Sequence, residues 1–282
     1  MAKIIDGKAI SAAIRGEIAA EVEQMKKNNG LVPGLAVIIV GEDPASQVYV
    51  RNKKKDCDET GINSIVHALP ENTTQEELLA LVHKLNNDDN VHGIIVQLPL
   101  PKHLDSELII NNIDSKKDVD AFHPYNVGKI MIGDYEFLPC TPAGVMALLE
   151  RSNIEVAGKN CVVVGRSNIV GKPQAMMLLH KNGTVTICHS KTKDLAEVCR
   201  SADVLVVAIG RAKMITGDMI KEGAVVIDVG MNRDENGKLC GDVDYESAEK
   251  KASYITPVPG GVGPMTRVML LQNTLSAAKK KI

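Results

Sequence analysis

Short runs rich in β-branched residues, chiefly valine and isoleucine, recur along this chain of 282 residues. They predict strands at 35–40, 93–98, 161–164, 184–188, 204–209 and 225–229, with a weaker one at 63–68. A strand with one face in water alternates apolar and polar positions, whereas the runs at 35–40, 161–164 and 204–209 are apolar throughout. That pattern is typical of parallel strands that are covered on both faces. The sequence therefore predicts buried parallel sheets.

Amphipathic segments lie between these runs and predict helices. Residues 75–85 and 173–180 place apolar side chains at helical spacing. A third helix should follow Asp43 and Pro44, which suit a helix start, and should end at Gly61. Alternating strands and helices indicate an α/β protein, in which right-handed crossovers place ligands at the carboxyl ends of the strands.

Two proline-containing breaks divide the chain. Residues 136–144 carry two prolines and lead into a helix, and residues 256–264 precede a final helix at 265–278. We therefore expect an N-terminal α/β domain before about residue 140 and a nucleotide-type domain after it.

Composition excludes several classes of protein. Hydrophobic residues make up 44% and charged residues 24%, which argues against disorder. A net charge of -2 provides no overall field for nucleic acid or an anionic membrane, so we expect neither partner. The apolar runs are far shorter than the roughly 20 residues that span a bilayer. The first residues lack the pattern of a secretory signal, and we expect a cytoplasmic protein.

The six cysteines show no Cys-x-x-Cys pair and no closely spaced histidine partners. Reduced thiols in the cytoplasm are the simplest interpretation. We therefore expect neither a disulfide framework nor a metal site.

The segment 160–173 has the pattern of a strand, a glycine turn and a helix start. Backbone N–H groups at such a helix start can bind a phosphate. The usual Gly-x-Gly-x-x-Gly spacing is absent, because Ser167 takes the second glycine position and Val170 the third. The turn alone therefore fits either a dinucleotide site or an ordinary strand–helix connection.

The end of the next strand bears on the choice of nucleotide. A carboxylate there would bind a ribose 2′-hydroxyl, but this chain has Ser190 and Lys191, with Arg166 in the glycine turn. Cationic and hydroxyl groups suit a 2′-phosphate, so NADP is favoured over NAD. An exposed polar loop is the alternative interpretation.

Three features of the first half point to chemistry, and each also has a structural explanation. Tyr49 and Lys53 share one face of a predicted helix, although a lysine run is often a solvated surface. Gln97 interrupts an apolar strand at its carboxyl end, where a buried amide needs a partner from the core or from a ligand. Asp118 and Asp120 lie in a predicted loop, where solvated carboxylates are common.

Taken together, these segments closely resemble the bifunctional methylenetetrahydrofolate dehydrogenase/methenyltetrahydrofolate cyclohydrolase family. The resemblance covers nearly the whole chain and is carried by residues 44–53, 93–101, 117–122, 139–144, 164–173 and 256–266. Two positions depart from the family pattern. Ala121 stands where the family often has glycine, and Met231 stands where a smaller aliphatic residue is common.

The resemblance implies two α/β domains flanking a cleft. Residues 1–140 plus 266–282 would form the catalytic, folate-binding domain, to which the last helix returns. Residues 141–265 would form a Rossmann-like parallel-sheet domain that binds NADP. The family resemblance also implies a homodimer joined through the nucleotide domains.

The implied activity belongs to one-carbon metabolism and purine biosynthesis. NADP-dependent oxidation of 5,10-methylenetetrahydrofolate gives 5,10-methenyltetrahydrofolate, and hydrolysis then gives 10-formyltetrahydrofolate. A dehydrogenase without the hydrolytic activity is one alternative, which the joint presence of Lys53, Gln97 and Asp120 argues against. A non-catalytic NADP-responsive regulator is another alternative, but the sequence has no DNA-binding motif or basic stripe through which such a regulator could act.

The resemblance also assigns roles to particular residues. Lys53 would be the general acid/base of the hydrolytic step and would have to be partly neutral near pH 7. Gln97 would hydrogen-bond Lys53, while Tyr49 would pack on the aminobenzoate ring and help to orient that lysine. Asp120 would bind the pterin edge. The implied substrate contacts are Tyr49, Lys53, Val96, Gln97, Leu98, Asp120, Pro259, Gly260, Gly261, Val262 and Gly263. The implied cofactor contacts are Thr141, Gly165, Arg166, Ser167, Ser190, Met231 and Thr266.

Overall fold

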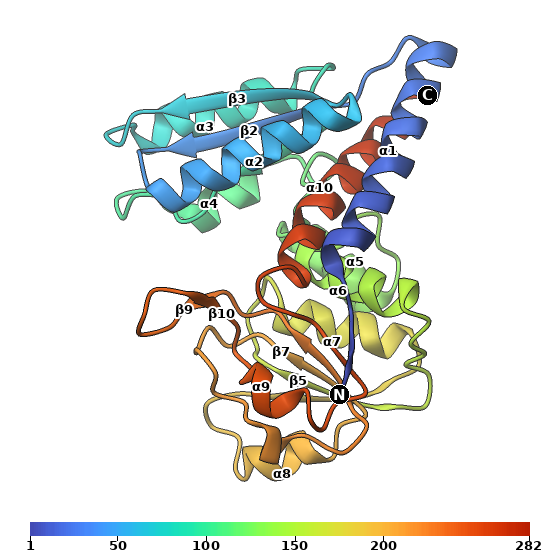
Figure 1. The fold of residues 1–282 in the computed structure, drawn as a ribbon. Helices are drawn as coiled ribbons and strands as arrows, with labels where there is room; N and C mark the ends of the chain where they lie inside the picture. Colours follow the sequence, from blue (N-terminus) through green and yellow to red (C-terminus); the bar gives the residue numbers. More distant parts are fainter. The chain divides into compact units, whose positions relative to one another are not determined.

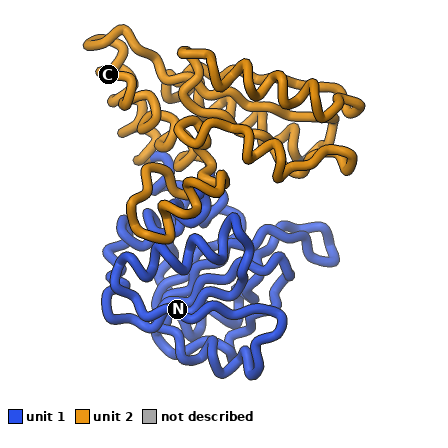
Figure 2. The backbone as a smooth tube through the Cα atoms, turned by 180° about the vertical axis from the view of Figure 1, so that it is seen from behind, with its two compact units in different colours: residues 1–12, 139–266 blue, residues 13–138, 267–282 orange. Residues whose placement is uncertain are grey.

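The computed structural model describes residues 1–282, apart from the side chain of Ala45. The chain folds into two compact units, coloured separately in Figure 2. The six-stranded unit contains Met1–Ala12 and Pro139–Thr266, and the three-stranded unit contains Ala13–Leu138 and Arg267–Ile282. Two helices, α1 (Gly7–Asn29) and α10 (Val262–Lys279), contribute residues to both units.

The six-stranded unit is built on one parallel sheet with the order β1-β11-β8-β7-β5-β6. Its strands are β1 (Lys3–Ile4), β5 (Asn160–Val164), β6 (Thr184–Cys188), β7 (Val204–Val207), β8 (Val225–Asp228) and β11 (Tyr254–Ile255). Between them lie α6 (Cys140–Arg151), α7 (Gly171–His180), α8 (Leu195–Arg200), a 3-10 turn (Gly217–Met219), α9 (Tyr245–Ala248) and the hairpin β9 (Asn232–Arg233)–β10 (Leu239–Cys240). Figure 1 labels most of these elements. The strand order reverses at β5, and ligands bind at such reversals beyond the carboxyl ends of the strands.

The three-stranded unit has a parallel sheet in the order β3-β2-β4. Its strands are β2 (Gly34–Val40), β3 (Asn63–Leu69) and β4 (Gly93–Val96), and its helices are α2 (Pro44–Thr60), α3 (Gln75–Asn86), α4 (Ser106–Asn112) and α5 (Pro124–Ile132). Ala36, Ile38 and Val40 of the central strand pack in one cluster with buried residues of α3 and α4. Strand alternation turns Leu35, Val37 and Ile39 to the opposite face, and these are buried as well. The continuous apolar runs therefore reflect a sheet covered on both faces.

The boundary signals of α2 act as the sequence predicts. The Asp43 side chain accepts a hydrogen bond from the Ser46 N–H at 2.8 Å, and Pro44 occupies the first turn. Gly61 ends the helix in the left-handed conformation, with a φ of 75°. These caps fix the helix that carries Tyr49 and Lys53.

The predicted fold class of two α/β domains, the second a Rossmann-like parallel sheet, is confirmed. One segment differs from the predicted boundaries, because residues 1–12 belong to the six-stranded unit rather than to the N-terminal domain. Lys3 and Ile4 pair in parallel with Tyr254 and Ile255 at the edge of the larger sheet. A strand of two residues is too short to give an apolar run, which explains the difference.

In the described part of the chain, no helix combines the length and the apolar character needed to cross a membrane. The six cysteines are all free and buried.

Candidate functional site

The turn after β5 is shaped by two glycines. Gly165 has a φ of 134°, and a Cβ atom there would lie 2.2 Å from the Ala208 carbonyl oxygen. A Cβ atom on Gly171 would lie 2.2 Å from the Gly165 carbonyl oxygen. Side chains are therefore excluded at both positions, and α7 starts in close contact with the turn. Gly171 takes the packing role of the third fingerprint glycine, one residue later than the usual spacing.

Ser167, at the position of the second fingerprint glycine, stabilises the start of α7. Its hydroxyl oxygen accepts hydrogen bonds from the N–H groups of Val170 at 3.1 Å and Gly171 at 3.3 Å. Lys172 extends away to bind Asn168, with 2.7 Å between Nζ and Oδ1. The turn is thus held by its own side chains.

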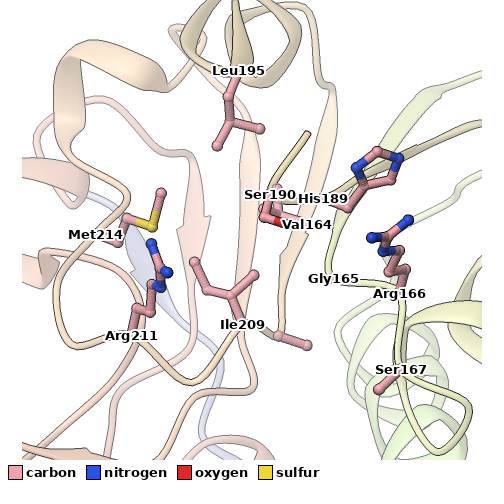
Figure 3. A pocket seen from close by; sticks show the side chains of 11 residues that line it. Val164, Gly165, Arg166, Ser167, His189, Ser190, Leu195, Ile209, Arg211 and Met214 are labelled. Atoms are coloured by element: carbon pink, nitrogen blue, oxygen red, sulfur yellow. The ribbon is translucent and has the colours of Figure 1, made fainter. Parts of the chain in front are cut away.

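A cavity of about 340 Å³ opens at the carboxyl ends of β5, β6 and β7 (Figure 3). The structure brings four predicted cofactor residues together in its lining: Gly165, Arg166, Ser167 and Ser190. The prediction missed seven further lining residues: Val164, His189, Leu195, Ala208, Ile209, Arg211 and Met214. Most of them end or directly follow a parallel strand, and this position is the signal that could have identified them.

The cavity has the chemistry of a dinucleotide site. Arg166 and Arg211 lie on opposite sides of it, and Leu195 and Ile209 point toward each other across it (Figure 3). Among the described lining residues there is no carboxylate. Guanidinium groups suit phosphate oxygens, and the apolar side chains suit a purine ring. The residues present therefore fit NADP better than NAD, which a carboxylate at the ribose would favour.

The other three predicted cofactor residues lie in the six-stranded unit but outside the lining of this cavity. Thr141 and Thr266 place their hydroxyl oxygens 3.0 Å apart. Met231 is 52% exposed, and its terminal methyl group lies 3.4 Å from the point where a Cβ atom on Gly263 would stand. Met231 is thus a neighbour of the glycine-rich segment 259–263.

That segment is held by the start of α1. The Lys8 N–H donates to the Gly260 carbonyl at 3.1 Å, and Gly7 lies so close to the Gly261 carbonyl that no side chain fits between them. Gly260, Gly261 and Val262 are buried, whereas Pro259 is exposed. The predicted substrate contacts in this segment therefore have a fixed backbone.

Lys53 and Gln97 meet in the three-stranded unit. The Lys53 ammonium nitrogen donates to Gln97 Oε1 at 3.0 Å, and Gln97 Nε2 donates to the Leu98 carbonyl at 2.7 Å. The second bond fixes the orientation of the amide, so that its oxygen faces the lysine. The Gln97 N–H donates to the Ile38 carbonyl at 2.8 Å, which continues the β2–β4 pairing. Both side chains are half-buried.

Tyr49 lies one helical turn before Lys53 on α2, and its side chain is 39% exposed. Val96, Leu98 and Asp120 line one small pocket at the carboxyl end of β4, together with Asp118 and Phe122. The structure thus brings Asp120 to the end of the strand that Gln97 follows. These predicted substrate residues come from three separate segments of the three-stranded unit.

Asp118 fixes the loop that carries Asp120. Its Oδ2 accepts hydrogen bonds from the His123 N–H and from Asn126 Nδ2, both at 2.8 Å. The side chain is buried, and burial raises the pKa of this carboxyl above its usual range. Asp118 is therefore a supporting residue rather than a solvated loop acid.

Asp228, at the end of β8, has a carboxylate enclosed in the six-stranded unit. It accepts N–H bonds from Gly230, Asp242 and Val243, yet burial outweighs them and raises the pKa of Asp228 to about 6. The folded pKa lies above the unfolded value of about 3.9. The stabilising contribution of this group is therefore complete below about pH 4 and is lost as pH rises through about 6.

We expect the ¹³C resonance of the Asp228 carboxyl to titrate near pH 6. The free energy of unfolding of the wild type should also fall, relative to Asp228→Asn, by on the order of 2 kcal/mol between pH 4 and pH 7. Urea unfolding at a series of pH values measures this difference. A difference that does not change with pH would contradict the assignment.

Among the described residues, no group of three or more histidine, cysteine, aspartate or glutamate side chains is arranged to hold a metal ion.

Comparisons with known proteins identify the family. A family sequence model described as "Tetrahydrofolate dehydrogenase/cyclohydrolase, catalytic domain" matches residues 5–120, and one described as "Tetrahydrofolate dehydrogenase/cyclohydrolase, NAD(P)-binding domain" matches residues 139–282. The chain is 66% identical over 278 residues to the bifunctional protein FolD of Acetivibrio thermocellus, covering 99% of this chain and 97% of that relative.

Two solved structures are similar along their full length. The bifunctional enzyme FolD, a methylenetetrahydrofolate dehydrogenase/cyclohydrolase from Campylobacter jejuni, is 54% identical with a TM-score of 0.98 and covers 100% of both chains. The Trypanosoma brucei enzyme, solved with NADP cofactor and an inhibitor, is 43% identical with a TM-score of 0.95, covering 99% of this chain and 98% of that one. The chain belongs to the tetrahydrofolate dehydrogenase/cyclohydrolase family.

Proposed function

We propose that this protein oxidises 5,10-methylenetetrahydrofolate with NADP⁺ and hydrolyses the resulting 5,10-methenyltetrahydrofolate to 10-formyltetrahydrofolate. The observation that carries the proposal is the 3.0 Å hydrogen bond between Lys53 Nζ and Gln97 Oε1. Family membership supports both activities. A nucleotide site alone would explain a dehydrogenase, whereas a lysine aligned by an amide is the added feature that hydrolysis requires.

Residues of the six-stranded unit would bind and orient the nucleotide. Arg166 and Ser190 would bind the 2′-phosphate, and the N–H groups of Arg166 and Ser167 would bind the pyrophosphate, since the Gly165 N–H already donates to the Cys188 carbonyl at 2.9 Å. Arg211 would contact the nucleotide from the side of the cavity opposite Arg166. Thr141, Met231 and Thr266 would provide further contacts to the cofactor. Bound NADP⁺ supplies the acceptor for the hydride that leaves the methylene carbon of the folate.

The folate is held mainly by the three-stranded unit. Asp120 accepts hydrogen bonds from the amide and amino groups of the pterin, and Tyr49 packs on the aminobenzoate ring. Val96 and Leu98 line the same pocket as Asp120.

Lys53 moves protons during hydrolysis. The neutral amine accepts a proton from water as its oxygen bonds to the methenyl carbon. The resulting ammonium then protonates N5 as the C–N5 bond breaks. The hydroxyl proton passes to water, which leaves a neutral formyl group on N10. The substrate cation disfavours a second positive charge nearby and so favours the neutral amine. Gln97 keeps that nitrogen in line.

The experiment that tests both activities uses the purified protein with 5,10-methylenetetrahydrofolate and either NADP⁺ or NAD⁺. Methenyl formation and its subsequent decay are followed by absorbance. We expect formation mainly with NADP⁺, followed by decay faster than in buffer alone. Formation without enzyme-dependent decay would support a dehydrogenase without hydrolysis, and nucleotide binding without formation would support a regulator.

Arg166 provides a test of nucleotide choice. We expect Arg166→Ala to raise KM for NADP⁺ about 10- to 100-fold while changing KM for NAD⁺ by less than about threefold, because only NADP⁺ carries the phosphate. Steady-state kinetics with each nucleotide measures the two values. Lys172→Ala is the matched control, since this cation lies at the start of α7, directly after the same turn, but binds Asn168. Equal losses with both nucleotides would show that Arg166 does not contact the 2′-phosphate.

We also propose a cytoplasmic homodimer joined through the six-stranded units, with no nucleic acid or membrane partner. β6 is the outermost strand of the larger sheet, so its free edge is available to a second copy. Six free buried thiols suit a reducing compartment, and the net charge of -2 suits the absence of anionic partners. Sedimentation of the purified protein measures its oligomeric state.

A further inference from the structure

We propose that Asp242 is a positioning residue for NADP⁺, because its buried carboxylate holds the backbone segment 209–211 that forms one wall of the nucleotide cavity. The inference rests on the proposed function and extends it to a residue outside the lining of the cavity.

Three consecutive backbone N–H groups converge on this one carboxylate. Asp242 Oδ2 accepts hydrogen bonds from Ile209 at 2.7 Å and Gly210 at 3.1 Å, and Oδ1 accepts one from Arg211 at 2.8 Å. The Asn232 side-chain amide donates to the same Oδ1 at 2.9 Å. Asp242 itself is fully buried. Four donors therefore share two oxygens that solvent does not reach.

The held segment faces the cavity with two of its side chains. Ile209 and Arg211 both line the cavity, and Figure 3 shows them on the side opposite Arg166. Their backbone N–H groups donate to Asp242, so the carboxylate holds this segment on the side away from the cavity. The width of the cavity between Arg166 and Arg211 therefore depends on the hydrogen bonds to Asp242.

Asp242 is itself fixed by Asp228 and β8. Its N–H donates to Asp228 Oδ1 at 3.0 Å, and the next N–H, of Val243, donates to Asp228 Oδ2 at 2.9 Å. Its carbonyl accepts the Ile215 N–H at 3.0 Å. Gly230 lies so close that a Cβ atom there would be 2.4 Å from the Asp242 carboxyl carbon. The carboxylate therefore has little room to move.

The arrangement needs a carboxylate rather than any polar group. A carboxylate has acceptor sites for all four donors, whereas an asparagine amide presents one accepting oxygen and one N–H₂ group. In Asp242→Asn, that N–H₂ group would face backbone N–H donors. Either the Ile209–Gly210 pair or the Arg211–Asn232 pair would lose its acceptor. The segment 209–211 would then shift, although asparagine occupies nearly the same volume as aspartate.

The experiment compares nucleotide-dependent and nucleotide-independent activity in the same full-length protein. We expect Asp242→Asn to raise KM and Kd for NADP⁺ at least about tenfold, since hydrogen bonds to a charged group are lost. Hydrolysis of added methenyltetrahydrofolate consumes no nucleotide and should stay within about twofold of wild type. Asn232→Ala, which removes only one of the four donors, should raise KM for NADP⁺ by about threefold or more.

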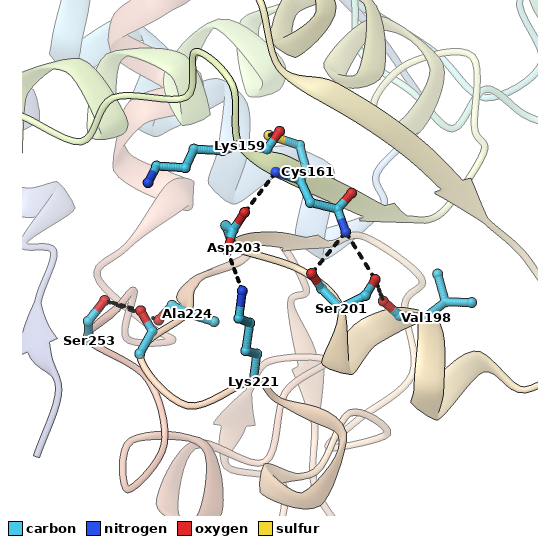
Figure 4. A network of polar contacts seen from close by, with 10 residues as sticks. Lys159, Cys161, Val198, Ser201, Asp203, Lys221, Ala224 and Ser253 are labelled. Carbon is cyan, nitrogen blue, oxygen red and sulfur yellow. Dashed lines mark hydrogen bonds and ion pairs between the residues drawn. The ribbon is translucent and has the colours of Figure 1, made fainter.

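Asp203→Asn is the matched control. Asp203 precedes the amino end of β7, the strand whose carboxyl end leads to Ile209, and its carboxylate accepts hydrogen bonds from the Asn160 N–H at 2.9 Å and from Lys221 Nζ at 2.6 Å (Figure 4). Losing this carboxylate should lower stability and leave KM for NADP⁺ unchanged. The comparison separates an effect on the cavity wall from the general loss of a carboxylate that anchors backbone near β7.

Two results would overturn the inference: an unchanged KM for NADP⁺ in Asp242→Asn, or an equal loss of both activities. If Asp242→Asn does not fold, the Asn232→Ala variant provides the test. A KM for NADP⁺ within twofold of wild type in that variant would contradict the proposed role of Asp242. A wild-type protein that does not use NADP⁺ would instead refute the proposed function.

Discussion

Replacing Lys53 with methionine is expected to abolish methenyl hydrolysis while NADP⁺ binding persists. A positioned general acid/base contributes about 10²- to 10⁴-fold to a rate, and methionine keeps the length of the side chain without a titratable nitrogen. The nucleotide cavity belongs wholly to the six-stranded unit, whereas Lys53 belongs to the other unit. The decay of methenyl absorbance measures hydrolysis, and a fluorescence titration measures Kd for NADP⁺.

Lys54→Met is the control for this result. Lys54 is the next residue of α2 and is exposed, whereas Lys53 is half-buried and bonded to Gln97. The control should hydrolyse the methenyl compound at nearly the wild-type rate. Wild-type hydrolysis by Lys53→Met would remove the catalytic assignment, and loss in both variants would point to a general effect of charge on α2.

Much of this fold could be predicted from the sequence, since its signals are local. The apolar runs at 35–40 and 161–164 mark strands, because burial on both faces leaves no polar positions. Asp43, Pro44 and Gly61 define α2, because helix ends need particular residues. Gln97 is recognisable as a polar residue directly after the apolar residues of β4, and its partner is Lys53.

Other features depend on contacts between distant segments, which no local pattern displays. The strand Lys3–Ile4 exists because β11, about 250 residues later, offers it an edge. His189, Arg211 and Met214 reach the cavity only through the order of the strands. Asp242 has the sequence pattern of a loop acid, and its role follows from three N–H groups that precede it by about 30 residues.

The second large effect is expected at Gly165. Gly165→Ala should lower the free energy of unfolding by more than about 3 kcal/mol and remove measurable NADP⁺ binding. Two costs combine, because a φ of 134° strains any side-chain residue by about 1–3 kcal/mol and the new methyl group would stand 2.2 Å from the Ala208 carbonyl oxygen. Since that oxygen belongs to the backbone, β5 and β7 must separate where the cavity opens. Urea unfolding and NADP⁺ titration measure the two losses.

Gly223→Ala separates the two costs. Gly223 also has a positive φ, of 80°, but a Cβ atom there meets nothing within 4 Å. This variant should therefore lose only about 1 kcal/mol and bind NADP⁺ normally. If the two variants lost the same stability and bound NADP⁺ equally well, backbone strain alone would explain both results. Close packing of the turn on β7 would then not determine the shape of the cavity. A larger loss of stability and of NADP⁺ binding in Gly165→Ala alone would show that the contact between β5 and β7 determines the shape of the nucleotide site.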